Sequence, residues 1–355
     1  MKGFNKKLPW LVIAAFTLAF MLGNGQVQAS EMTRGENIMR FYGEVMPMSA
    51  GAQQNQIWFF GPTTPDGNGE HGGGTWAWAQ STGTLTLTNL TLISDAFTAI
   101  AFIGDAAIVL NGANHIESTF VLGGQSTAIF GDGNITLSGS GSLTAIAAGG
   151  SESDDTIAIY SEGDVIVESG ITVNAVGGSG GVGTSAGIAS WGNVIVNGGT
   201  VTSSGGTAPD SRGIMGNLNM DGNGVVFASS TDTVVRNNGI LFDGNSGTVY
   251  GNVTLEMDLT IPNGYTLTVP SGTTIVNNAA INNSGTINNL GTINNVGGGT
   301  IIGNPPVGDG AVLVPTPPTG IADITSAITA MFAFLAISAV LWGFVLRGKL
   351  RRVKA

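Results

Sequence analysis

The sequence predicts an all-β fold in which short parallel strands coil into a β-helix. One pattern recurs about five times between residues 98 and 230: an isoleucine after a small residue, a turn, and an apolar–polar–apolar triplet. The isoleucines follow one another at a nearly constant interval that shortens only at the last step (Ile100, Ile129, Ile159, Ile188 and Ile214). Glycine makes up 57 of the 355 residues, which disfavours helices because each glycine costs roughly 1 kcal/mol against alanine. A fixed period of this size is typical of a solenoid.

In this reading each repeat is one coil, and successive coils stack about 4.8 Å apart in parallel register. The isoleucines and the outer residues of each triplet (108–110, 135–137, 165–167, 194–196 and 218–220) would form internal aliphatic ladders. We expect turns at Gly131, Gly163 and Gly192, where a positive φ or close stacking excludes a Cβ. Loops of variable length, such as residues 177–184, would project from one corner.

Residues 1–29 have the features of a secretory signal peptide. Lys2, Lys6 and Lys7 form a basic start, residues 8–22 are apolar, and Val27 and Ala29 precede a cleavage site before Ser30. An uncleaved anchor is the alternative, but the apolar stretch is short for a membrane span. Residues 30–52 are expected to be a linker.

Residues 53–80 are aromatic and are expected to cap the N-terminal end of the solenoid. Trp76 and Trp78 are two residues apart, so in a strand both face one side. They would either stack on sugars, beside Glu70 and His71, or cover the end of the β core, which would otherwise expose apolar surface and unpaired edges.

The parallel β-helix itself is assigned to residues 81–253, and an asparagine-rich extension with a shorter period to residues 254–303. Isoleucines recur there every six residues, followed by pairs of asparagines (282–283, 288–289 and 294–295). Six residues match one side of a compact coil. The asparagines would form hydrogen-bonded ladders or a polar spacer. Residues 304–320 contain five prolines and predict a semi-rigid stalk.

The C-terminal segment predicts a membrane anchor over residues 321–346. Residues 324–346 carry no charge and as a helix would be about 34 Å long, enough for a bilayer core. Five basic residues follow within 347–355, so this tail should stay cytoplasmic and the body should lie outside the cell.

The end of the chain resembles the cell-wall sorting signal of Gram-positive bacteria. Pro317, Thr319 and Gly320 precede the apolar segment and the basic tail, although Thr316 stands where the family usually has leucine. The resemblance implies that a sortase cleaves after Thr319 and joins it to peptidoglycan. A single-pass anchor retained in the membrane is the alternative.

Two stretches, residues 158–167 and 187–201, resemble repeats of clostridial surface proteins that fold as a right-handed parallel β-helix. The resemblance covers the repeated region between residues 98 and 230 and implies the handedness. One such group binds carbohydrate and calcium, and this leaves the ligand of the present chain open.

Charge limits the possible partners. Between residues 30 and 320 there are 22 acidic residues, four arginines and no lysine, and such a surface should repel nucleic acid and anionic lipid. Carboxylates suit calcium, and Asp154, Asp155, Glu162 and Asp164 are the candidate ligands. A solvated acidic corner without metal is the alternative. The chain has no cysteine, so no disulfide stabilises it.

The sequence does not favour catalysis. No nucleophile motif, zinc-ligand spacing or phosphate-binding loop is present. We expect a structural or adhesive surface module that binds polysaccharide, with Trp76, Trp78 and Trp191 as candidate stacking residues. A polysaccharide lyase or hydrolase on the same fold and a passive surface-layer spacer are the alternatives.

Overall fold

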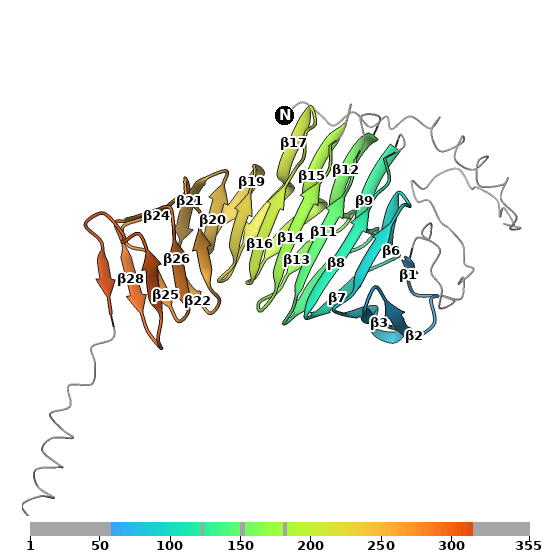
Figure 1. The fold of residues 1–355 in the computed structure, drawn as a ribbon, viewed down its shortest axis with the longest axis horizontal. Helices are drawn as coiled ribbons and strands as arrows, with labels where there is room; N and C mark the ends of the chain where they lie inside the picture. Colours follow the sequence, from blue (N-terminus) through green and yellow to red (C-terminus); the bar gives the residue numbers. More distant parts are fainter. Residues whose placement is uncertain (1–57, 122–123, 150–152, 180–182, 315–355) are drawn as a thin grey trace, which may run out of the picture. The chain divides into compact units, whose positions relative to one another are not determined.

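The computed structural model describes residues 58–314 except 122–123, 150–152 and 180–182 (Figure 1). The predicted signal peptide, the linker, the sorting motif at Pro317, Thr319 and Gly320, the anchor and the basic tail lie outside the described residues. Among the described residues, no helix has the length and apolarity needed to cross a membrane. One short 3₁₀ helix, η1 (Gln80–Thr82), accompanies the strands.

The described part is a parallel β-solenoid, which confirms the predicted all-β, repetitive architecture. Its first stack of coils has three faces, and strands on each face pair in parallel with equivalent strands of neighbouring coils. Face 1 contains β1 (Trp58–Phe60), β6 (Thr98–Phe102), β9 (Gly124–Gly131), β12 (Ser153–Ser161) and the first halves of β15 (Thr184–Val196) and β17 (Asp210–Met220). Face 2 contains β4 (Thr84–Thr88), β7 (Ala106–Asn111), β10 (Ile135–Gly139), β13 (Val165–Val167), the second halves of β15 and β17, and β19 (Thr231–Arg236).

Face 3 is one sheet of ten strands that runs through both parts of the solenoid. It contains β5 (Thr91–Ser94), β8 (Ala113–Ser118), β11 (Ser142–Ala147), β14 (Thr172–Gly177), β16 (Thr200–Ser204), β18 (Val225–Ala228), β20 (Gly239–Asp243), β21 (Ser246–Tyr250), β24 (Thr266–Val269) and β27 (Thr286–Asn289). The three undescribed internal segments all fall between face 3 and face 1 in the chain, where the sequence predicted loops of variable length.

The isoleucine ladder lies inside the first stack, as predicted. Ile100, Ile129, Ile159, Ile188 and Ile214 are in register and fully buried. The residue before each isoleucine is small because it is also enclosed: a Cβ on Gly187 would lie 2.2 Å from Ser203 Oγ. The recurring small residue therefore marks the place where each coil has no room for a larger side chain.

The N-terminal end of the first stack is closed by an antiparallel sheet. β2 (Gly67–His71) and β3 (Gly74–Ala79) pair antiparallel with each other, and β3 pairs antiparallel with β4. From β1 and β3, four aromatic rings enter the end of the first core (Trp58, Phe60, Trp76 and Trp78).

A hairpin marks the junction between two cores. β20 pairs antiparallel with β21, so the strand direction on face 3 reverses there. On β18 and β20, Val226 and Leu241 belong to the first core, whereas Ile240 and Phe242 belong to the second. Since neighbouring residues of a strand point to opposite sides, the two cores occupy opposite faces of this one sheet. At the junction the strand direction reverses, and the side of the sheet that faces the core changes as well. The two changes cancel, so both stacks wind with the same handedness.

The second stack is narrower, and each side of a coil is one short strand. Besides β21, β24 and β27, it contains β22 (Asn252–Leu255), β23 (Leu259–Ile261), β25 (Thr274–Asn277), β26 (Ala280–Asn283), β28 (Thr292–Asn295), β29 (Thr300–Gly303) and β30 (Ala311–Leu313). Ile275 pairs with Ile293, and Ile281 with Ile301. The six-residue spacing in the sequence therefore corresponds to one side of a coil.

Asparagines occupy the corners of this second core. The second asparagine of each pair is buried (Asn283, Asn289 and Asn295). Asn277, one strand earlier, is buried as well. Asn277 Nδ2 donates to Asn295 Oδ1 at 2.8 Å and to the carbonyl oxygen of Thr300 at 3.1 Å. Asn283 and Asn289 donate to carbonyl oxygens of the next coil. These amides satisfy backbone groups where the chain turns and the strand ladder is interrupted.

Candidate ligand-binding surface

Two of the three tryptophans proposed to stack on sugars are buried. Trp76 and Trp78 point inward from β3, with 8% and 4% of their surface exposed. Trp78 Nε1 donates to the carbonyl oxygen of Thr64 at 3.0 Å, and its ring packs against Phe60 and Phe102. In this arrangement neither indole offers an open ring face to a sugar.

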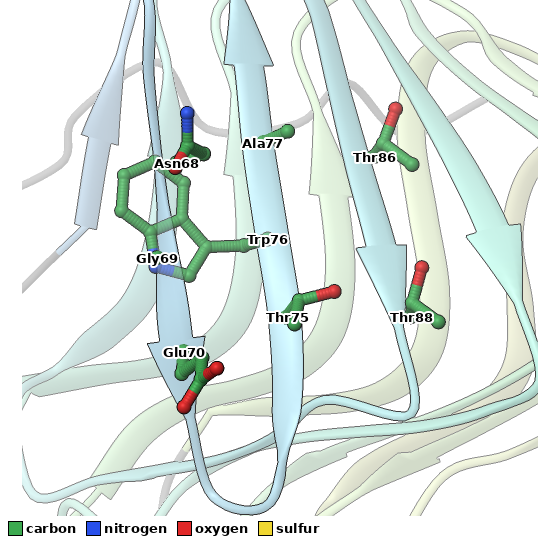
Figure 2. Close-up of a pocket in the computed structure, with 8 residues that line it drawn as sticks. All are labelled: Asn68, Gly69, Glu70, Thr75, Trp76, Ala77, Thr86 and Thr88. Carbon is green, nitrogen blue, oxygen red and sulfur yellow. The ribbon is translucent and has the colours of Figure 1, made fainter.

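A shallow depression lies over the outside of this end sheet (Figure 2). Its volume is about 300 Å³. The indole of Trp76 lies against β2 because Gly67 and Gly69 have no side chains, and a Cβ on Gly69 would be 2.8 Å from Trp76 Nε1. The other lining side chains are mostly short and polar (Asn68, Glu70, Thr75, Ala77, Thr86 and Thr88). The depression offers hydroxyls and a single carboxylate, without a paired acid and base.

The proposed calcium ligands do not share a site, because two of their carboxylates accept hydrogen bonds from different backbone groups. Asp155 Oδ1 accepts from the backbone N–H of Thr184 at 2.8 Å. Asp164 Oδ1 accepts from the backbone N–H of Asn193 at 2.7 Å and from its Nδ2 at 3.1 Å. Glu162 is exposed, and the side chain of Asp154 lies outside the described residues. Within the described part of the chain, no three acidic or histidine side chains are grouped to hold a metal.

Asp164 instead belongs to a ladder at the corner between face 1 and face 2. In this ladder, each side-chain oxygen accepts the backbone N–H of its counterpart in the next coil. Asp105 accepts from Asn134 at 2.8 Å, and Asn134 accepts from Asp164 at 2.7 Å. The predicted turn glycines Gly163 and Gly192 lie beside this ladder, where a Cβ would come within 2.5 Å of Asn134 Oδ1 or 2.3 Å of Asp164 Oδ1. These aspartates have a structural partner.

The third tryptophan, Trp191, lies in a column of outward-facing residues next to this corner. Gly131, Ser161 and Ser190 are in register on face 1. The residues that follow them, Asp132, Glu162 and Trp191, therefore occupy successive coils. Trp191 is 74% exposed, more than any other large apolar side chain described.

Two further rings lie beside this column. Phe130 and Tyr160 precede Asp132 and Glu162 by two residues, so they share the outer side of face 1. Their ring centroids are 5.6 Å apart. We call Phe130, Asp132, Tyr160, Glu162 and Trp191 the aromatic-acidic surface. The residue types and local motifs of the sequence indicate Glu162 and Trp191 but not the other three. Their signal is the repeat itself, because these residues follow the ladder isoleucines by one or three positions (Phe130, Asp132 and Tyr160).

Burial and negative charge shift the titration of this surface. Burial raises the pKa of the Tyr160 phenol, and the carboxylates of Glu162 and Asp155 raise it further. Although the Glu162 side chain is exposed, its carboxyl is partly desolvated by the surrounding groups, and this raises its pKa, with a further contribution from Asp132 in the neighbouring coil. At neutral pH the Tyr160 hydroxyl thus stays protonated and can donate a hydrogen bond.

The two arginines of the described chain do not neutralise this surface. Arg212 Nε donates to Asp210 at 2.7 Å, and Arg212 also pairs with Asp232. The guanidinium of Arg236 lies over the ring of Tyr250, 5.4 Å from its centroid. The aromatic-acidic surface therefore combines ring faces with uncompensated carboxylates.

The raised pKa of Glu162 predicts a pH-dependent gain of stability on neutralisation. The folded state binds this proton more tightly than the unfolded state, so its stabilising contribution is present at low pH and disappears as pH rises through the folded-state pKa. Glu162→Gln should melt at a higher temperature than the wild type at pH 7. The difference should vanish at about pH 3.5, below the ordinary carboxyl value of 4.5. Thermal melting followed by circular dichroism at both pH values measures this, and an equal shift at both would contradict it.

No protein-family model matches the chain, and searches of curated proteins and of solved structures found no match either.

Proposed function

We propose that this chain is an exported β-solenoid displayed on the cell surface, where it acts as an adhesive module that binds polysaccharide. The observation that supports binding is the exposed indole of Trp191 beside Glu162 on the aromatic-acidic surface. Aromatic rings present apolar faces, and carboxylates accept hydrogen bonds from hydroxyls. Together these groups suit a sugar chain lying along the coils. The proposal includes right-handed winding, as in the repeats that the sequence resembles.

The lack of a free cation narrows the class of polysaccharide. A uronate or sulfated polymer would bring negative charge to a surface that carries Asp132 and Glu162 and contains no basic residue. The repulsion between the negative charges of the polymer and of these carboxylates would oppose association. The surface therefore suits a neutral or amine-bearing polysaccharide.

A glycan array probed with purified residues 30–315 tests this function. Binding to neutral or amine-bearing glycans supports the proposal. Release of reducing ends or unsaturated products would instead support a lyase or hydrolase, and absence of both binding and products would support a passive spacer.

The anchoring at the cell surface is a separate part of the proposal. Cleavage after Thr319 by a sortase would link the solenoid to peptidoglycan through the short segment that follows β30 (residues 314–319). Thr319→Ala is expected to abolish release of the protein with the wall fraction after muramidase digestion and to leave it in the membrane fraction. Thr63→Ala, at an exposed loop position outside the motif, is the matched control and should stay linked to the wall. Wall linkage retained in Thr319→Ala would favour a mechanism without sortase cleavage at this position.

A further inference from the structure

The C-terminal coil of the second stack is open. β29 pairs only with β26, β30 pairs only with β28, and a single bridge joins Val307 to Asn288. Within the described chain, the outer edges of these strands have no strand neighbour. Figure 1 shows this end of the stack beyond β26 and β28.

The open coil also exposes the ladder that is buried elsewhere. Val312 stacks on Ile293 in the ladder, yet Val312 is 41% exposed while Ile293 is fully buried. The other ladder residue of this coil, Ile301, is half-buried. Three more exposed aliphatic side chains of the coil point outward, in register with the outer asparagines of the previous coil (Ile302, Val307 and Leu313). The opposite end of the solenoid differs, because aromatic rings of β1 and β3 fill the end of the core there.

Neither the residues that follow directly nor a lipid surface suits this end. The next residues include Pro315, Pro317 and Pro318, which have no backbone N–H to continue a strand ladder. Lipid could cover the aliphatic side chains, but it cannot satisfy the backbone N–H and C=O groups of an open edge. Another strand edge meets both requirements.

β30 itself carries no protecting charge or proline, although it is only three residues long and Pro305, Pro306 and Asp309 precede it in the same coil. Prolines and charged side chains, lysine above all, protect natural edges from pairing. From residue 259 to residue 314 the chain carries a single charge, Asp309. Two copies can therefore approach at this end without the repulsion expected elsewhere on the acidic chain.

We propose that the open coil docks against the same coil of a second copy of this chain. A two-fold axis would place β30 antiparallel to its counterpart, as an isologous contact requires. The sheet of β22, β25, β28 and β30 would then continue into the partner, and the Val312 ladders would meet end to end. This dimer does not depend on polysaccharide binding.

Cysteine cross-linking of the full-length chain in lipid vesicles tests the proposal, since the natural chain has no cysteine. Leu313→Cys should form a disulfide-linked dimer when copper phenanthroline and oxygen accept the two electrons lost by the thiols. Adding Val312→Lys should slow dimer formation at least tenfold, because two ammonium groups would be buried at the contact. Leu290→Lys, on a side chain that is 47% exposed, is the matched control and should leave the rate unchanged.

Three results would overturn the proposal. One is equal dimer formation by Leu313→Cys and by Thr202→Cys, which places the thiol on the exposed outer side of β16. Another is no effect of Val312→Lys. The third is an introduced thiol at position 313 that neither dimerises nor reacts with a membrane-impermeant maleimide, because this would show that the bilayer covers the end.

Discussion

Phe242→Ala is expected to split thermal unfolding into two transitions. Phe242 is fully buried and stacks on Phe227 with ring centroids 4.3 Å apart. Removing such a ring costs about 3–5 kcal/mol. It belongs to the second core, so the loss should fall on residues 246–313 and leave the first stack folded. For a unit of this size the lower midpoint should drop by more than about 10 °C.

Differential scanning calorimetry of the purified ectodomain measures this change. Leu290→Ala provides the control, because a truncation on an exposed side chain should change stability by less than about 0.5 kcal/mol. A single transition at the wild-type midpoint in Phe242→Ala would show that the shared sheet alone holds the second core.

Trp191→Ala is expected to weaken polysaccharide binding by about 30-fold. Central tryptophans of binding surfaces typically contribute about 2 kcal/mol or more, which corresponds to about this factor. Because Trp191 is mostly exposed, its removal should leave the melting temperature unchanged. Titration of a glycan identified on the array, by calorimetry or fluorescence, gives the affinity.

Two variants make this result specific. Trp191→Phe should recover part of the affinity, since it keeps a ring face. Ile93→Ala removes an exposed apolar side chain from β5 on face 3 and should bind as the wild type does. Unchanged affinity in Trp191→Ala would exclude the aromatic-acidic surface as the binding site, whatever the array shows.

The interior of the first stack could be predicted from the sequence because its period is strict. Ile129, Ile159 and Ile188 recur at a nearly constant interval, and all three are buried in one ladder. The buried asparagines carried a weaker signal. Asn283 follows Ile281 by two residues, so both point inward, whereas Asn282 points outward. The alternation of inward and outward positions could be read from the sequence, but an asparagine pair is equally typical of an exposed turn.

The junction could not be predicted in the same way. β18 and β20 are apolar on both sides because each lies between two cores. A continuous apolar run of this kind is consistent with any fully buried strand. Which face of the sheet each core uses depends on the β20–β21 hairpin, and the repeat pattern contains no information about it.

The candidate site was only partly predictable. The spacing of Trp76 and Trp78 indicated that both rings face one side of β3, but the side depends on how the end sheet closes over the core. The sequence suggests Asp164 as a calcium ligand, whereas in the coil its oxygen accepts the backbone N–H of Asn193. Acidic residues that are close in the chain suggest a metal cluster. In a solenoid, however, the spatial neighbours of a residue are the equivalent residues of the preceding and following repeats.

The corner ladder of Asp105, Asn134, Asp164 and Asn193 has a consequence for sequence drift. Each side chain holds a backbone group of the following coil, so an insertion or deletion before this corner displaces every later partner by the same amount. From Asp105 to Asn193 the corner keeps one length, and the length changes fall at the opposite corner between face 3 and face 1. The corner itself shortens by two residues only in the next coil, beyond the ladder, where Ile188 and Asn193 pair with Ile214 and Asn217. Variation among coils should accumulate at the corner between face 3 and face 1, while the binding column beside the ladder keeps its spacing.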